Sequence, residues 1–189
     1  MPSTTHRWSL ALASVVLAAS AFGAEVAGVK LDDRVTVGGK ELVLNGAGMR
    51  SRAIFKVYVG ALYLPAKAGD LAATLAQSPR RVQMTLLRNV GADDLVGALV
   101  DGMNANNSPQ EMASVKAQTD QLVALMKTIG EAKTGDIVTM DFVDGETRVG
   151  HNGKAIGAIA GAAFNDALLK IWLGDKPVQA DLKKAMLGG

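Results

Sequence analysis

The sequence contains no cysteine, only two histidines in 189 residues, and an aromatic fraction of only 4%. Without cysteine there is no disulfide, thiolate nucleophile, cysteine-linked lipid anchor or Cys-ligated metal. One histidine, His151, follows the N-terminal apolar segment, and it stands beside a predicted exposed turn at Asn152–Gly153. This argues against a Ser–His triad and against a metal cluster. Paired-carboxylate glycosidase chemistry stays open, although no aromatic-rich platform for a sugar accompanies it.

The sequence has no concentrated positive charge. Twenty Lys and Arg stand against 18 Asp and Glu, and the longest basic runs are the pairs Arg80–Arg81 and Lys183–Lys184. Because nucleic acids bind clusters of basic side chains, we expect no nucleic-acid partner. The glycines at positions 150, 153, 157 and 161 match neither a dinucleotide-binding nor a P-loop spacing. We expect no cofactor.

The N-terminus has the pattern of a secretory signal peptide. A weakly basic start at His6 and Arg7 is followed by an apolar run from Trp8 to Ala19 and then by small residues. The run is too short to span a membrane and ends as signal peptides do. Cleavage after Ala21 or Gly23 would put a small residue at both recognition positions.

The sequence therefore predicts a signal peptide over residues 1–24 and one domain over residues 25–189. The mature chain would begin between Phe22 and Glu25 and keep about 165 residues, enough for a sizeable core. We expect a periplasmic or secreted protein with no integral membrane span after processing. The alternative is an N-terminal anchor helix that is retained.

Apolar periodicity and turn residues predict an α+β fold. The expected strands are 26–31, 34–37, 40–44, 53–64, 81–88, 136–143, 147–150 and 154–159. The expected helices are 70–77, 93–103, 108–130, 164–173 and 177–187. The third of these begins with a capping box at Ser108–Glu111. Hairpin-linked strands with blocks of helices indicate an antiparallel sheet with helices layered on one side.

The best candidate for a ligand site is the stretch from Asn45 to Pro65. It begins with a predicted Gly-Ala-Gly turn, continues with Arg50 and Arg52, and then runs as an apolar strand that carries Lys56 and Tyr58. An arginine held near apolar surface needs an anion or hydrogen-bond partners. This combination indicates a binding site more than a purely structural element.

The spacing of the two main candidates sets a geometric condition. If the strand were straight, Arg50 and Tyr58 would lie roughly 26 Å apart at about 3.3 Å per residue. They can bind one ligand group only if the chain reverses or bulges sharply between Ser51 and Phe55. Farther along, Arg88 ends another apolar row, and we expect it to lie at the rim of the fold.

Two motifs taken together resemble the chalcone isomerase-like superfamily. The first is NGAGMR at 45–50 followed by KVYVGALYL at 56–64, and the second is LKIWLGDKPVQADLK at 169–183. The similarity in order and spacing extends from about Val26 to the C-terminus. It implies an open-faced β-sandwich, with a large antiparallel sheet, a layer of helices and a ligand cleft between them.

This family includes plant enzymes that cyclise chalcones and non-catalytic members that bind fatty acids. The resemblance places Arg50 at the arginine that holds the phenolate nucleophile in the enzymes. The enzymes also use two threonines, a tyrosine, a lysine and an asparagine. Those positions are occupied here by Tyr58, Ile171, Leu95, Leu86 and Gly102.

A tyrosine in a Lys-Val-Tyr context is similar to the fatty-acid-binding branch, in which an arginine and a tyrosine hold the carboxylate. We therefore expect an exported, non-catalytic binder of a small apolar carboxylate such as a fatty acid. Its ligand-binding residues would be Arg50 and Tyr58, and it would use no catalytic residue, cofactor or metal.

Four alternatives remain open from the sequence. The first is an intramolecular lyase or isomerase of the chalcone isomerase type, with Arg50 as electrostatic catalyst. The second is a helical surface that docks a membrane or a partner protein. The third is haem binding, for which His151 or a methionine would have to be the axial ligand. In the fourth, Arg50 and Tyr58 pair only with backbone and structural acids.

Overall fold

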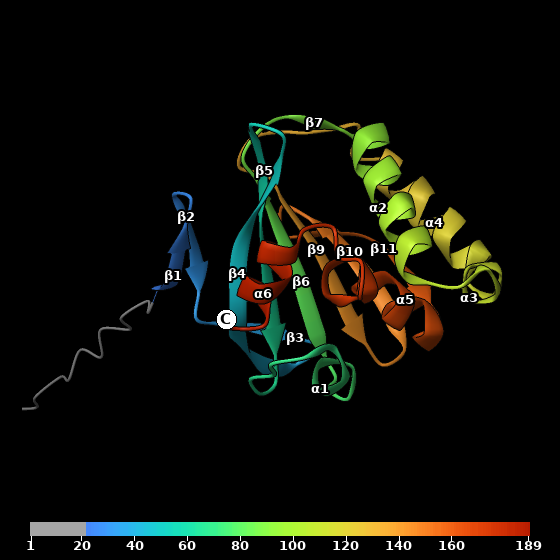
Figure 1. Cartoon of the computed structure of the whole chain (residues 1–189), viewed down its shortest axis with the longest axis horizontal. Helices are drawn as coiled ribbons and strands as arrows, with labels where there is room; N and C mark the ends of the chain where they lie inside the picture. The colour runs from blue at the N-terminus through green and yellow to red at the C-terminus, as the bar shows by residue number, and fades with distance from the viewer. Residues whose placement is uncertain (1–21) are drawn as a thin grey trace, which may run out of the picture.

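The computed structural model describes residues 22–189, which form a large antiparallel sheet with helices on one face (Figure 1). The sheet has seven strands in the order β11-β10-β9-β6-β5-β4-β3. Their bounds are β3 Arg34–Val37, β4 Lys40–Arg52, β5 Phe55–Leu64, β6 Arg80–Leu86, β9 Ile137–Val143, β10 Glu146–His151 and β11 Lys154–Ala160. Two further pairs are β1 (Phe22–Val26) with β2 (Val29–Asp32) and β7 (Val90–Gly91) with β8 (Glu131–Ala132).

Six helices are described, and most of them build the layer that covers the sheet. They are α1 Leu71–Leu75, α2 Ala92–Asn106, α3 Pro109–Ser114, α4 Lys116–Lys127, α5 Ala162–Leu173 and α6 Ala180–Met186. In Figure 1, α6 crosses β4 and β5, whereas α2 and α4 lie beyond α5 on the β11 side. Within residues 22–189, no helix combines the length and the apolar character that crossing a membrane requires.

Both faces of β5 are covered. Its even-numbered apolar residues, such as Tyr58 and Leu62, belong to the core between sheet and helices. The odd-numbered residues Val59 and Tyr63 belong to a second, smaller core on the other face, against which the β1–β2 pair packs. Side chains of β5 point alternately to the two faces of the sheet, so this one strand contributes to both cores. The expected α+β class and open-faced sandwich are confirmed.

One prediction around the first motif was wrong. The glycines at 46 and 48 were expected to form a turn, but they lie inside β4, and neither has a positive φ. The strand expected over 53–64 is confirmed as β5, which begins two residues later, at Phe55. Ala53 takes the left-handed conformation at φ 53° and starts the reversal between β4 and β5.

Two other elements are divided by short breaks. The strand expected over 26–31 is the β1–β2 hairpin, turning at Ala27 and Gly28 with φ values of 49° and 84°. The helix expected over 108–130 is interrupted at Val115, whose φ of −110° and ψ of 14° separate α3 from α4. Val115 is buried there, so packing of its side chain accompanies the break. The capping box predicted at Ser108–Glu111 is confirmed. The Ser108 side chain accepts a hydrogen bond from the Glu111 backbone N–H, and the Glu111 side chain accepts one from the Ser108 backbone N–H.

The predicted signal peptide concerns residues 1–24, of which 1–21 lie outside the described residues.

The glycines of the first motif permit the close approach of α6. A Cβ on Gly46 would lie 2.1 Å from the Ala185 carbonyl oxygen, and one on Gly48 would lie 2.7 Å from the Cβ of Ala185. Gly48 is the cross-strand partner of Gly60, where a Cβ would meet a Leu182 methyl group at 3.3 Å. The glycines therefore form a flat surface on which α6 packs.

This packing predicts opposite effects for two glycine substitutions. Gly46→Ala should lower the free energy of unfolding by about 1–3 kcal/mol, because the new methyl group meets backbone rather than a flexible side chain. Gly97→Ala, inside α2 with nothing within 4 Å of the new Cβ, should raise it by up to about 1 kcal/mol. Urea denaturation measures both values. Equal stability of the two variants would contradict the packing role of Gly46.

Candidate functional site

The hairpin between β4 and β5 brings the two candidate residues together. The chain reverses between Ser51 and Phe55, and Arg50 becomes the direct cross-strand partner of Tyr58. Directly opposed residues on antiparallel strands share a face, with Cβ atoms about 4.5–5.5 Å apart. The geometric condition set by the sequence is met, on the face that carries the helices.

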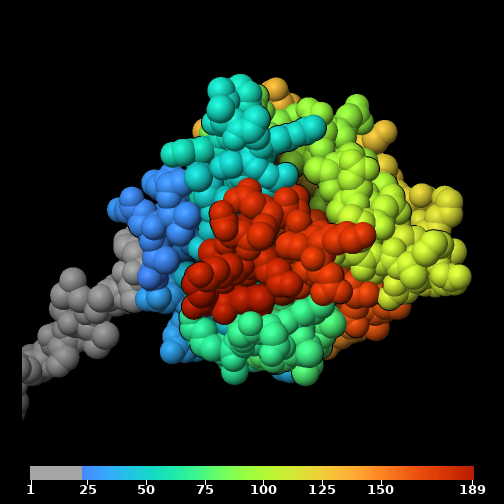
Figure 2. Space-filling view, viewed as in Figure 1, coloured from blue at the N-terminus to red at the C-terminus, as the bar shows by residue number. Residues whose placement is uncertain are grey.

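Both residues line a cleft of about 610 Å³ between the β4–β5 hairpin, α2 and the segment after α5. Figure 2 shows its mouth where these three parts of the surface meet. Its apolar wall includes Val57, Met84, Val90, Leu95, Ala98, Leu99, Met126, Ile171, Trp172, Pro177 and Val178. Its charged and phenolic groups are Arg50, Arg52, Tyr58, Asp93, Asp94, Asp101 and Lys176. The cleft is therefore apolar inside and polar at its edges.

The Tyr58 hydroxyl is buried and held by one hydrogen bond. Trp172 Nε1–H donates to it at 3.0 Å. Burial raises the pKa of Tyr58 to about 12, although the Trp172 hydrogen bond and the charge of Arg50 both act to lower it. At neutral pH the hydroxyl is thus protonated, and because it accepts from Trp172, its own hydrogen is available to donate to another group.

The Arg50 guanidinium is fixed by neutral groups. Its Nη1–H donates to the Ser51 carbonyl and, at 3.3 Å, to Gln179 Oε1. Gln179 also accepts from the Ser51 backbone N–H at 2.9 Å and donates to the Met49 carbonyl at 3.1 Å. Within residues 22–189 no carboxylate pairs with Arg50. Its Nε–H and Nη2–H groups are therefore free to bind an anion.

Acidic and basic side chains lie on opposite sides of the cleft. Asp93, Asp94 and Asp101 are exposed on α2, and Asp93 pairs with Lys127 at 3.5 Å. Arg50 and Arg52 come from the opposite side, on the hairpin. An anionic ligand group would be repelled by the α2 side and attracted by the hairpin.

Three polar residues singled out from the sequence lie elsewhere. Lys56 and Arg88 are outside the cleft lining, and Arg88 stacks its guanidinium 4.6 Å from the Phe55 ring centre. His151 was expected in an exposed turn, but it ends β10, is partly buried and shares a hydrogen bond of 3.0 Å with Asp136. In the described part of the chain, no three His, Asp or Glu side chains gather as a metal site would need.

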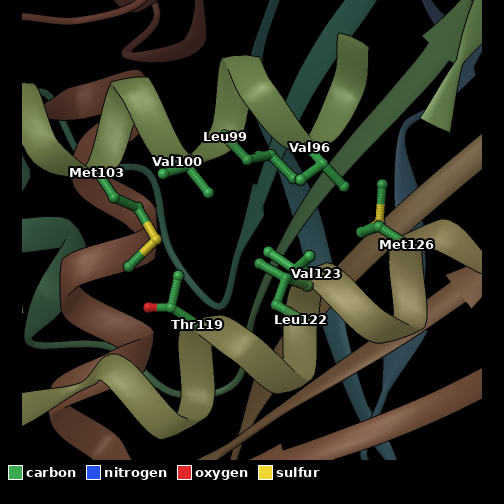
Figure 3. Close-up of a pocket in the computed structure, with 8 residues that line it drawn as sticks. All are labelled: Val96, Leu99, Val100, Met103, Thr119, Leu122, Val123 and Met126. Carbon is green, nitrogen blue, oxygen red and sulfur yellow. The ribbon is translucent and has the colours of Figure 1, made fainter. Parts of the chain in front are cut away.

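The space between α2 and α4 is too small to be a second candidate for a ligand site. Figure 3 shows Leu99 and Met103 of α2 facing Thr119 and Leu122 of α4. The remaining cavity is about 10 Å³, close to the minimum for a single water molecule. These side chains and Met126 of α4 fill the space between the two helices.

The interpretation of single residues missed two that hold the site in place. Neither Trp172 nor Gln179 was proposed as a site residue, yet Trp172 donates a hydrogen bond to Tyr58 and Gln179 accepts one from Arg50. Both belong to the second motif, at 169–183. The pairing of the two motifs in the resemblance was the signal that could have found them.

Comparison with known proteins gives one family and one fold. A sequence model of the chalcone isomerase-like family matches residues 23–188. The crystal structure of a fatty-acid binding protein from Arabidopsis thaliana (AtFAP1) is similar, with a TM-score of 0.65 and 10% identity. The match covers 85% of this chain and 92% of that one. No curated protein sequence matches the chain.

The burial of Tyr58 predicts that its hydroxyl loses its proton at a higher pH than an exposed tyrosine does. In Tyr63→Phe, where Tyr58 is the sole tyrosine, tyrosinate absorbance should appear near pH 12 rather than near the ordinary value of about 10. Since the folded pKa exceeds the unfolded one, the protonated phenol favours the fold below pH 10, and this contribution is lost between pH 10 and 12. Urea-unfolded protein is the control. Tyrosinate forming near pH 10 in the folded variant would contradict the burial.

Proposed function

Because the chain belongs to the chalcone isomerase-like family, we propose that it binds a small apolar carboxylate, such as a fatty acid, in the cleft beside Arg50. The observation that carries this proposal is the register of the hairpin, which sets Arg50 opposite Tyr58 at the polar edge of an apolar cleft. Arg50 and Tyr58 would hold the carboxylate, and the apolar wall would hold the chain.

The donors at this edge suit a carboxylate. A guanidinium with two free N–H directions can bind both oxygens of one carboxylate, and such charge-assisted bonds are stronger than neutral ones. The protonated Tyr58 hydroxyl adds one further donor. The acids of α2 favour the same orientation, because they repel the carboxylate from the other side of the cleft.

The size and lining of the cleft suit an apolar chain. Its volume of about 610 Å³ lies within the range of about 300–1,000 Å³ that small-molecule sites occupy. Leu95, Leu99, Met126 and Ile171 offer no buried charge with which such a chain would have to compete. The fatty-acid binding protein of similar fold gives this choice of ligand further support.

An isomerase has weaker support from the same side chains. A phenolate nucleophile would need polar partners besides Arg50. The resemblance to the plant enzymes implies such partners at Leu95, Gly102 and Ile171, three side chains that line the cleft without a polar group. Tyr58, with its pKa raised to about 12, is a poor proton acceptor at neutral pH. We propose a non-catalytic binder, and we propose that it acts in the periplasm or outside the cell, following the signal-like residues 1–24.

Fatty-acid affinity should depend on the two proposed donors. Arg50→Gln should weaken binding of oleate about 10- to 100-fold, because charged hydrogen bonds contribute about 1.5–3 kcal/mol. Tyr58→Phe should weaken it about 2- to 10-fold, because a neutral bond contributes about 0.5–1.5 kcal/mol. Isothermal titration calorimetry measures both, and chalcone cyclisation should stay at its spontaneous rate.

The matched control is Arg34→Gln, which removes an exposed arginine of β3 that pairs with Glu41. It should bind oleate as the unmodified protein does. Methyl oleate, which has no carboxylate charge, should bind the unmodified protein and Arg50→Gln equally. Undiminished oleate binding by Arg50→Gln would remove the basis of the proposal, and cyclisation above the spontaneous rate would favour the isomerase.

A further inference from the structure

An exposed apolar pair lies at the turn between β4 and β5. Ile54 is 89% exposed and Phe55 is 53% exposed, and they are the two large hydrophobic side chains exposed within residues 22–189. The hairpin that carries them stands at the edge of the molecule in Figures 1 and 2. Scattered single apolar residues are ordinary on a surface, but adjacent ones on a turn add nothing to the core.

Cations without acidic partners surround this pair. Of the seven arginines in the described residues, Arg34, Arg80, Arg81 and Arg148 form salt bridges. The remaining three, Arg50, Arg52 and Arg88, are all at this end of the hairpin. Lys56 is a fourth such cation, and residues 51–56 contain no acid. We call residues 52–56 together with Arg88 the hairpin tip.

Arg88 shows how charge and apolar surface are combined. Its guanidinium lies 4.6 Å from the centre of the Phe55 ring, a cation–π distance. The charge therefore stays beside the ring, although Arg88 follows a different strand, β6. The β4–β5 hairpin and the segment after β6 thus contribute to one small surface that is apolar at its centre and positive around it.

We propose that the hairpin tip docks on an anionic lipid surface. Isoleucine and phenylalanine side chains insert at the boundary of headgroups and acyl chains, and neighbouring Lys and Arg bind anionic headgroups. A protein partner fits less well, because a stable interface needs about 800 Å² on each side, more than two side chains can supply. The positive charge selects an anionic surface over a neutral one.

The tip adjoins the cleft, since Arg52 belongs to both. Docking would therefore bring the mouth of the cleft to the lipid surface. That consequence rests on the proposed function, whereas lipid binding by the tip does not, and it can be tested with an empty cleft.

Sedimentation with vesicles tests the proposal on the full mature chain. The protein should sediment with vesicles of phosphatidylglycerol and phosphatidylcholine, and weakly with phosphatidylcholine alone. Lys56→Glu/Arg88→Glu should lower the partition coefficient at least tenfold, given about fivefold for each cation at the surface. Ile54→Ser/Phe55→Ser should lower it at least about tenfold through lost apolar burial. Salt should weaken binding as it screens the charges.

The control is Lys40→Glu/Lys154→Glu, which changes net charge equally at two exposed positions, one of them the far end of β4. It should retain binding, and thermal unfolding should show that all variants are folded. The proposal is overturned if the unmodified protein does not bind anionic vesicles, or if tip and control variants lose binding equally. It is also overturned if ultracentrifugation finds a dimer that the Ile54→Ser/Phe55→Ser change dissociates, because a second copy would then cover the tip.

Discussion

The close packing of α6 on the glycines of β4 and β5 is the constraint on which the site depends. Side chains at Gly46, Gly48 or Gly60 would hold the C-terminal segment away from the sheet. Because they are absent, the segment before α6 reaches the end of β4, where Gln179 binds the Ser51 backbone N–H and the Arg50 side chain. The glycines thus position Arg50 indirectly, because they let α6 pack closely and so bring Gln179 within reach of the arginine.

The same segment explains why the two motifs belong together. The C-terminal motif supplies Trp172 to the Tyr58 hydroxyl and Gln179 to Arg50, across more than a hundred residues of sequence. Each of these partners is neutral, so neither cancels the positive charge of Arg50. Fixing a cation with neutral groups leaves its charge available to an anion, whereas a carboxylate partner would neutralise that charge.

Local sequence signals predicted much of the fold and only half of the site. Alternation and capping residues are local, so the fold class, most strands and the Ser108 cap could be predicted. Glycine is ambiguous, since it serves both turns and close packing, and Gly46 and Gly48 were read as a turn. The reversal at Ala53 could be stated only as a condition between Ser51 and Phe55, because no turn residue marks it. The contacts of Trp172 and Gln179 depend on tertiary packing, which no local pattern encodes.

The protonation state of Tyr58 connects the structure to the choice between binding and catalysis. Burial makes the phenolate costly, and the hydrogen bond from Trp172 together with the charge of Arg50 offsets only part of that cost. A group held in its neutral form is a donor over the whole physiological range, which suits a carboxylate that must be retained. The acids on α2 would then act on the orientation of the proposed ligand, because its carboxylate would meet repulsion on the α2 side and two kinds of donor on the other. Burial, hydrogen bonding and long-range charge would therefore favour the same arrangement of the proposed ligand, with its anionic group at the hairpin and its apolar chain against α2 and α5.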